Sequence, residues 1–160
     1  MTTMMMELTK DMTSKYGNSK YRICGNTFDS KAEGEYYVHL LGLKKIGKVK
    51  DIILQPVAEL QPKFTYAGKT IRPITYIPDF LVEYSDGYKE YVDIKGVSTK
   101  DGELKLKMFM FKYQNGIPIK WIAKGDGLGM PLWIDYFEKQ AIIRKHEREK
   151  RNVAKRYIKM

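Results

Sequence analysis

The residues with the clearest chemical potential are two aspartates and a lysine near the middle of the chain. Asp79 follows a proline, and one residue separates Asp93 from Lys95. Two carboxylates suffice to hold Mg²⁺, because water and substrate phosphate fill its remaining positions. Residues two apart on a strand share a face, so the Lys95 ammonium would stand beside Asp93 and could orient a water or neutralise developing charge. Metal-dependent hydrolysis of a phosphodiester requires such a set of side chains.

The two aspartates lie on either side of a predicted hairpin. Two β-rich segments flank turn residues 85–87, which include a glycine. With a two-residue turn, Asp79 would oppose Ile94, and the carboxylates would face opposite sides of the sheet. With a three-residue loop that ends in a left-handed glycine, Asp79 opposes Asp93 and the carboxylates converge. We predict the three-residue loop, or a bulge at Pro78 with the same effect.

A purely structural explanation of this motif is also open. Short acidic and basic triplets are common on solvent-facing strands, where the charges are only hydrated. Here apolar residues surround both aspartates along the chain, and buried charges are costly unless they are paired or metal-bound. The alternative to a metal site is therefore an ion pair between Asp93 and Lys95.

A third carboxylate comes from a helix predicted upstream. Residues 28–47 have the apolar spacing of an amphipathic helix that opens at Asp29 or Ser30 and closes at Gly47. Glu33 falls in the middle of the apolar face. Two explanations, which are compatible, are open: Glu33 caps the helix together with Ser30, or it completes a three-carboxylate metal site.

These residues resemble the motifs of the PD-(D/E)XK nuclease superfamily, whose members have the restriction-endonuclease-like fold. The resemblance spans residues 28–122 and is closest to a small phage-borne family of unassigned function. Holliday junction resolvases of similar size share the superfamily. The residues that carry the resemblance are Glu33 on the first helix, Pro78-Asp79 on one strand and Asp93-Ile94-Lys95 on the next.

The resemblance implies an endonuclease that depends on Mg²⁺ or Mn²⁺ and acts on DNA, with a branched Holliday junction as one candidate substrate. It implies Glu33, Asp79, Asp93 and the Ile94 carbonyl as metal ligands, and Asp79, Asp93, Lys95 and Glu33 as catalytic residues. Resolvases cut twice, symmetrically, so a homodimer is implied as well. The other interpretations are a nucleic-acid-binding protein without catalysis and a phage interaction protein with a basic tail.

The expected fold class is α/β, with a restriction-endonuclease-like core and a central mixed sheet of four or five strands flanked by helices. We expect a mobile basic arm at residues 1–23, the nuclease core at 24–130, and a helix at 131–160 that is amphipathic and then basic. On the family resemblance alone, Gln55 and Gln61 are expected near the active site.

Two further elements are predicted after the hairpin. Residues 101–114 form a helix whose apolar positions are Leu104, Met108 and Phe111, with Phe109 as a further candidate. Residues 117–123 form a strand that runs parallel to an inner strand, because a helix precedes it.

The net charge of +10 favours a polyanionic partner such as DNA. Basic residues gather on the two later helices, and a solvated surface or a dimer-forming C-terminal helix would explain them equally well. The candidate DNA contacts are Lys100, Lys105, Lys107, Lys112, Arg144, Lys145, Arg148 and Arg151.

Other chemistries lack the residues they need. Two histidines and one cysteine are too few to build a His-Cys zinc site, an HNH-type nuclease or a Ser-His-Asp hydrolase. The glycine-rich run at residues 125–129 has no Rossmann context and is predicted to be a turn, so no nucleotide cofactor is expected. With no apolar run of about 18 residues and no signal peptide, we expect no membrane partner and a cytoplasmic location, that of the host cell if the gene is phage-borne.

Overall fold

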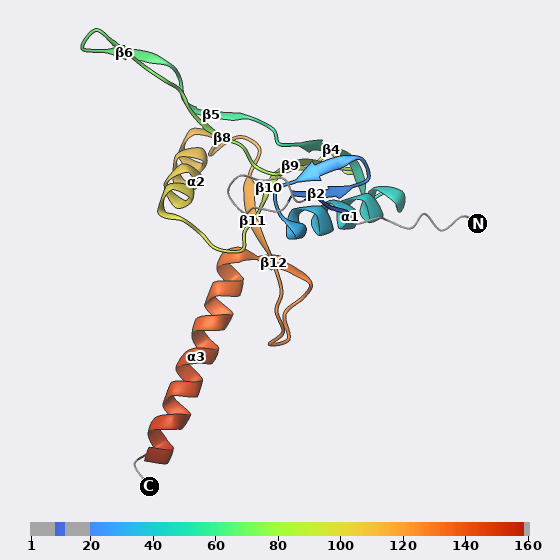
Figure 1. Ribbon diagram of the computed structural model, residues 1–160, viewed down its shortest axis with the longest axis vertical. Coiled ribbons are helices and arrows are strands. Elements are labelled where there is room, and N and C mark those ends of the chain that lie inside the picture. Colours follow the sequence, from blue (N-terminus) through green and yellow to red (C-terminus); the bar gives the residue numbers. More distant parts are fainter. Residues whose placement is uncertain (1–8, 12–19, 159–160) are drawn as a thin grey trace.

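The computed structural model describes residues 9–11 and 20–158, and its centre is a mixed five-stranded sheet (Figure 1). The strand order is β12-β11-β10-β9-β4; β10 and β11 are parallel, and the other neighbours are antiparallel. The strands are β4 (Val49–Leu54), β9 (Phe80–Tyr84), β10 (Lys89–Ile94), β11 (Ile119–Lys124) and β12 (Trp133–Asp135). The predicted α/β class, the central mixed sheet and the parallel strand are confirmed.

Helix α1 (Lys31–Lys45) covers one face of this sheet. It buries Tyr36 and Leu40 against Phe80 and its neighbours on the inner strands. The helix begins at the Ser30 cap and is followed by Gly47, whose φ of 74° only glycine adopts without strain. The predicted helix is therefore confirmed, although its first predicted residue, Phe28, belongs to a preceding strand.

Helix α2 (Lys100–Lys112) lies on the opposite face, with Leu106 and Phe109 buried beside Trp121 of β11. The prediction of the apolar face was wrong for Leu104, which is 58% exposed, and for Phe111, which is 79% exposed, whereas the further candidate Phe109 is buried. Apolar residues occur all around this helix, so periodicity does not select a side. Packing against the sheet decides which side is buried.

Between β4 and β9 the chain leaves the sheet as a long two-stranded extension, which we call the arm (residues 58–76; Figure 1). At its base β5 (Ala58–Gln61) pairs with β8 (Ile74–Tyr76). Further out, β6 (Phe64–Tyr66) pairs with β7 (Lys69–Ile71). Ala67 and Gly68 form the turn between these outer strands, with φ values of 48° and 74°.

A second small sheet stands before α1. Its strands are β1 (Thr9–Asp11), β2 (Lys20–Ile23) and β3 (Asn26–Phe28), paired antiparallel in that order. The prediction of a mobile arm is wrong for residues 20–23, because the Ile23 side chain is buried against α1. The predicted arm also includes residues 1–8 and 12–19, which lie outside the described residues.

The C-terminal helix α3 (Tyr136–Ile158) begins later than predicted. Its predicted first turn is instead strand β12, which pairs with β11, and Asp135 accepts the Phe137 and Glu138 amide protons at 2.9 and 3.1 Å. The first turn packs Tyr136 against Trp121, and the rest of α3 projects away from the sheet (Figure 1). None of the helices in the described ranges is long and apolar enough to cross a membrane.

Candidate active site

The hairpin between β9 and β10 has the three-residue loop that the sequence predicts. Tyr84 N donates to Tyr88 O at 2.8 Å, and Gly87 closes the loop with a φ of 87°. The register pairs Phe80 with Val92. Continued by one residue, it sets Asp79 opposite Asp93, so the two aspartates share a face of the sheet as predicted.

Asp79 stands just before β9 and is tied to the neighbouring strand. Its Oδ2 accepts the Ile94 amide proton at 2.6 Å, while its own carbonyl accepts the Gln55 amide proton at 2.9 Å. The preceding Pro78 is buried. Because side chain and backbone are both bonded, the Asp79 carboxylate is held beside β10 and cannot swing into solvent.

Among the residues that the structure describes, Asp93 is one of two buried acidic residues, and polar side chains surround its Oδ2 atom. That oxygen accepts a hydrogen bond from the Tyr76 hydroxyl and lies 2.7 Å from Lys95 Nζ. The Tyr76 oxygen in turn accepts the Trp121 Nε1 proton at 2.5 Å. A buried chain of hydrogen bonds from Trp121 through Tyr76 therefore holds the Asp93 carboxylate in place.

Lys95 lies at the edge of the buried cluster, with its side chain 24% exposed. Its ammonium is 5.1 Å from the centre of the Trp121 ring, within the range of a cation–π contact. The alternative ion pair of Asp93 and Lys95 is thus present in the structure. It is compatible with a metal site, because the ammonium offsets part of the negative charge that the aspartates bring together.

Glu33 acts as a helix cap. Its Oε2 accepts the Asp29 amide proton at 3.1 Å, its Oε1 accepts the Ser30 hydroxyl proton at 2.8 Å, and its own amide donates to Ser30 Oγ at 3.2 Å. This reciprocal pair is a capping box. The capping explanation is confirmed, and the metal-ligand explanation stays a prediction.

The three carboxylates are close enough to perturb one another. Burial, and then the charges of Asp93 and Glu33, raise the pKa of Asp79 to about 8, although the Ile94 amide acts in the opposite direction. Burial is also the largest cause that raises the pKa of Glu33, with a smaller contribution from Asp93. Perturbed carboxylates that converge are typical of functional sites, because they need a proton or a cation to offset their charge.

A cavity of about 210 Å³ opens beside Glu33 and Asp79, and Asp93 does not line it. Glu33 and Asp79 supply its carboxyl groups, and Asn26 and Gln55 supply its side-chain amides. Gln55 has a φ of 48°, which is uncommon outside glycine. Gln55 therefore lies beside Glu33 and Asp79 of the candidate site, whereas Gln61 lies at the base of the arm and does not line this cavity.

The donor chemistry fits a divalent cation held by two carboxylates. Asp79 and Asp93 each bond protein donors through Oδ2, and Mg²⁺ or Mn²⁺ favours carboxylate, carbonyl and water oxygens. Within residues 9–11 and 20–158, however, no group of three or more histidine, cysteine, aspartate or glutamate side chains is arranged to hold a metal. The fit is to two aspartates, with the Ile94 carbonyl as a further candidate oxygen.

The candidate DNA contacts fall on two separate surfaces. On α2, Lys105 is paired with Asp101 at 3.6 Å and Lys112 with Glu59 at 3.5 Å, whereas Lys100 and Lys107 are exposed and seven residues apart on one face. On α3, the candidates Arg144, Lys145, Arg148 and Arg151 are all exposed, as are Lys150 and Lys155, and Arg151 is paired with Glu147 at 3.6 Å. The α3 surface lies on the part of the helix that projects from the sheet.

Sequence reasoning missed two members of the cluster. Neither Tyr76 nor Trp121 is among the site residues predicted from the sequence. Their hydrogen bond joins residues 45 positions apart. The proximity of Tyr76 to Pro78-Asp79 was the one available signal, and no sequence pattern marks Trp121.

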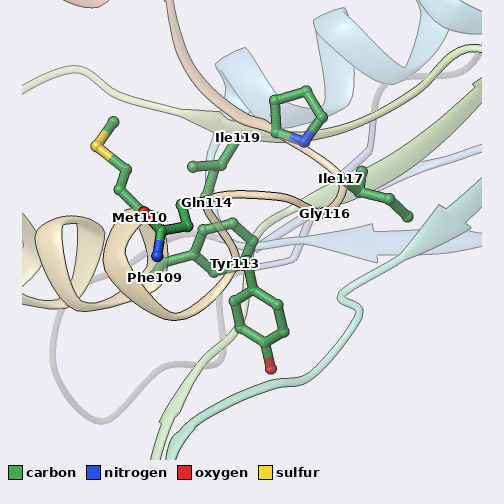
Figure 2. Close-up of a pocket in the computed structure, with 8 residues that line it drawn as sticks. Phe109, Met110, Tyr113, Gln114, Gly116, Ile117 and Ile119 are labelled. Carbon is green, nitrogen blue, oxygen red and sulfur yellow. The ribbon is translucent and has the colours of Figure 1, made fainter.

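A larger pocket, about 290 Å³, lies at the C-terminal end of α2 (Figure 2). Phe109, Tyr113 and Ile119 are among the side chains that line it. None of the carboxylates described above borders it, so we do not include it in the candidate active site.

Residues 13–128 match the family described as a protein of unknown function, DUF1064. Because this match covers most of the chain, the protein belongs to that family. The matched range includes all three carboxylates, Lys95 and the arm, and it ends before β12. No curated protein matches the chain.

Proposed function

We propose that this protein is a metal-dependent endonuclease that hydrolyses phosphodiester bonds in DNA. The observation that carries the proposal is the convergence of Asp79 and Asp93 on one face of two neighbouring strands, with Lys95 Nζ 2.7 Å from Asp93. The motif order along the chain and the resemblance to PD-(D/E)XK nucleases support it. Residues 24–130 are the proposed nuclease core.

Asp79, Asp93 and the Ile94 carbonyl would hold the cation in this proposal. When bound, Mg²⁺ or Mn²⁺ activates water and stabilises charge on the phosphate oxygens. The protein orients these ligands beforehand: the Ile94 amide restrains Asp79, and Tyr76 restrains Asp93. Such preorganisation lowers the cost of reaching the transition state.

Lys95 supplies the positive side chain nearest to the aspartates. Its partly exposed ammonium can approach a phosphate oxygen and offset the charge that develops there. Trp121 limits the freedom of this side chain through its ring contact. We propose that Lys95 is the catalytic amine.

The basic surfaces would hold the substrate. Lys100 and Lys107 on α2, with the arginines of α3, are exposed and would contact the phosphates of the substrate. A branched DNA substrate and a homodimer follow from the resemblance to Holliday junction resolvases and are part of the proposal.

A non-catalytic DNA-binding protein is the second candidate. The observation that favours it is that each of the three carboxylates is bonded to protein donors, which a purely structural network would also show. The two candidates predict different responses to metal.

Cleavage of labelled linear and branched DNA, with and without Mn²⁺, tests the proposal. We expect metal-dependent cleavage that Asp93→Asn abolishes and that Asp86→Asn, at the exposed turn of the same hairpin, leaves unchanged. Titration calorimetry with Mn²⁺ should show binding that Asp79→Asn and Asp93→Asn each weaken. If the wild type shows no cleavage and no metal binding, the enzyme is refuted. In that case retained DNA affinity would favour the DNA-binding protein, and loss of DNA affinity would favour an interaction protein.

A further inference from the structure

The outer hairpin of the arm, residues 64–71, exposes apolar side chains that nothing in the described chain covers. All six residues of β6 and β7 are exposed, and Tyr66 is 72% exposed. A two-stranded hairpin on its own is only marginally stable in water. An exposed, projecting ribbon of this kind is typical of a binding element.

Strand pairing sorts the side chains of the outer hairpin onto two faces. Phe64 pairs with Ile71 and Tyr66 pairs with Lys69, so these four side chains share one face. The intervening pair of threonines faces the other way. One face is therefore mainly aromatic and aliphatic, and the other is polar.

The charge of this segment has a single sign. Between residues 60 and 78 the chain has no aspartate or glutamate, and its charged residues are Lys63, Lys69 and Arg72, all exposed. Cations interleaved with exposed aromatic residues are the combination that nucleic acids recognise, because phosphates attract the cations and bases or sugars contact the rings.

The base of the arm is fixed next to the candidate active site. Tyr76 at the end of β8 bonds Asp93, and Asp79 follows three residues later. Tyr113 of α2 donates its hydroxyl proton to the Glu59 carbonyl at 2.9 Å, which braces the other strand of the base. The arm is therefore anchored beside the candidate active site, and its outer hairpin projects away from the central sheet (Figure 1).

We propose that the outer hairpin is a DNA-binding element that enters a groove of duplex DNA. A two-stranded ribbon fits the major groove, and ribbons that read DNA in this way are known as a class. Lys63, Lys69 and Arg72 contact phosphates, and the exposed ring of Tyr66 contacts the groove. The inference rests on the proposed function for the choice of DNA as the nucleic acid, but the binding needs no cleavage.

Fluorescence anisotropy with labelled duplex DNA, in EDTA at several salt concentrations, separates binding from cleavage. The triple variant Lys63→Gln, Lys69→Gln, Arg72→Gln should bind at least about tenfold more weakly, with a salt slope reduced by about 3 because each lost phosphate contact removes about 1. The aromatic variant Phe64→Ala, Tyr66→Ala should lose about tenfold in affinity with an unchanged salt slope.

The matched control is the variant Lys44→Gln, Lys45→Gln, Lys48→Gln, which also removes three positive charges but lies away from the arm. These residues are exposed and lie where α1 ends. We expect this control to change affinity and slope much less than the arm variant does. Equal losses in the two triple variants would overturn the inference, because net charge alone would then explain the binding.

The remaining outcomes distinguish this inference from the proposed function. Arm-dependent binding without metal-dependent cleavage would support the inference and reject the nuclease. Cleavage and binding at wild-type levels in both arm variants would overturn the inference and leave the nuclease intact. Light scattering tests whether the hairpin instead binds a second copy of this chain. If the wild type is a dimer and the variant Phe64→Ala, Tyr66→Ala is a monomer with unchanged DNA affinity, the hairpin is a dimer contact and the inference is overturned.

Discussion

The Tyr76 hydroxyl donates a hydrogen bond to Asp93 Oδ2, and so joins the base of the arm to the central sheet. The same oxygen accepts the Trp121 indole proton at 2.5 Å. Removal of this one hydroxyl would leave a buried donor unpaired and one side of a buried carboxylate unsupported.

Tyr76→Phe should therefore lower both stability and metal affinity. An unsatisfied buried donor costs about 1 to 3 kcal/mol, and loss of a group that orients a metal ligand costs about 10- to 100-fold in affinity or activity. Denaturant unfolding and Mn²⁺ calorimetry measure the two effects. Tyr113→Phe, which also loses a tyrosine hydrogen bond but far from Asp93, is the control. Equal effects of the two variants on metal affinity would contradict a positioning role for Tyr76.

The hairpin and the first helix were predictable because local chemistry determines them. Gly87 and the turn before it select a three-residue loop, and this loop alone decides that Asp79 meets Asp93. Ser30 and Glu33 have the spacing of a capping box, and the structure contains one. In each case the deciding interaction joins residues a few positions apart.

Features that depend on tertiary contacts could not be predicted. The buried face of α2 is selected by Trp121, so Leu106 and Phe109 are inside and Phe111 is outside. The strands β3 and β12 have three residues each, which is too short for an alternating pattern to be distinguished from chance. The role of Tyr76 depends equally on a partner far along the chain.

Lys95→Met should separate catalysis from metal binding. If the ammonium stabilises charge in the transition state, cleavage should fall by about 10²- to 10³-fold, while Mn²⁺ still binds to the aspartates. Initial cleavage rates and calorimetry measure the two quantities. Lys100→Met, at an exposed position on α2, should reduce cleavage only slightly and at low salt. Similar rates in the two variants would leave Lys95 as a structural partner of Asp93.

The two explanations of Glu33 make opposite predictions. Ser30→Ala removes the cap and should cost about 1 kcal/mol of stability with little effect on metal affinity. Glu33→Gln keeps an oxygen and a donor at the cap but removes the charge, so it should weaken Mn²⁺ binding only if Glu33 ligates the ion. Unfolding curves and calorimetry on both variants decide the matter. Unchanged metal affinity in Glu33→Gln would restrict its role to the cap.

The metal-free protein should lose stability as the pH rises, because of Asp79. Its pKa is raised from an ordinary value of 3.8 to about 8, so the folded state binds a proton that the unfolded chain releases between these values. The stability from this group is complete below about pH 4 and is lost as the pH rises through about 8. Asp79→Asn, which does not titrate, should flatten the pH dependence of Tm in EDTA. Mn²⁺ should restore the stability of the wild-type protein at high pH, because the cation replaces the proton. If Tm depends on pH equally in the wild type and in Asp79→Asn, this account is contradicted.

Two glycines of α1 should respond oppositely to alanine. Gly34 is buried, and a Cβ there would overlap Ile23 Cδ1 of β2, whereas a Cβ at Gly42 meets no atom within 4 Å. Gly34→Ala should therefore destabilise the protein by about 1 to 3 kcal/mol through overpacking, and Gly42→Ala should stabilise it by up to about 1 kcal/mol through helix propensity. Denaturant unfolding measures both changes. Ile23→Ala in the Gly34→Ala background should recover part of the loss if the overlap is its cause. If Gly34→Ala and Gly42→Ala increase the free energy of unfolding equally, β2 does not pack on α1 in solution. The small N-terminal sheet would then not support the end of α1 that presents Glu33.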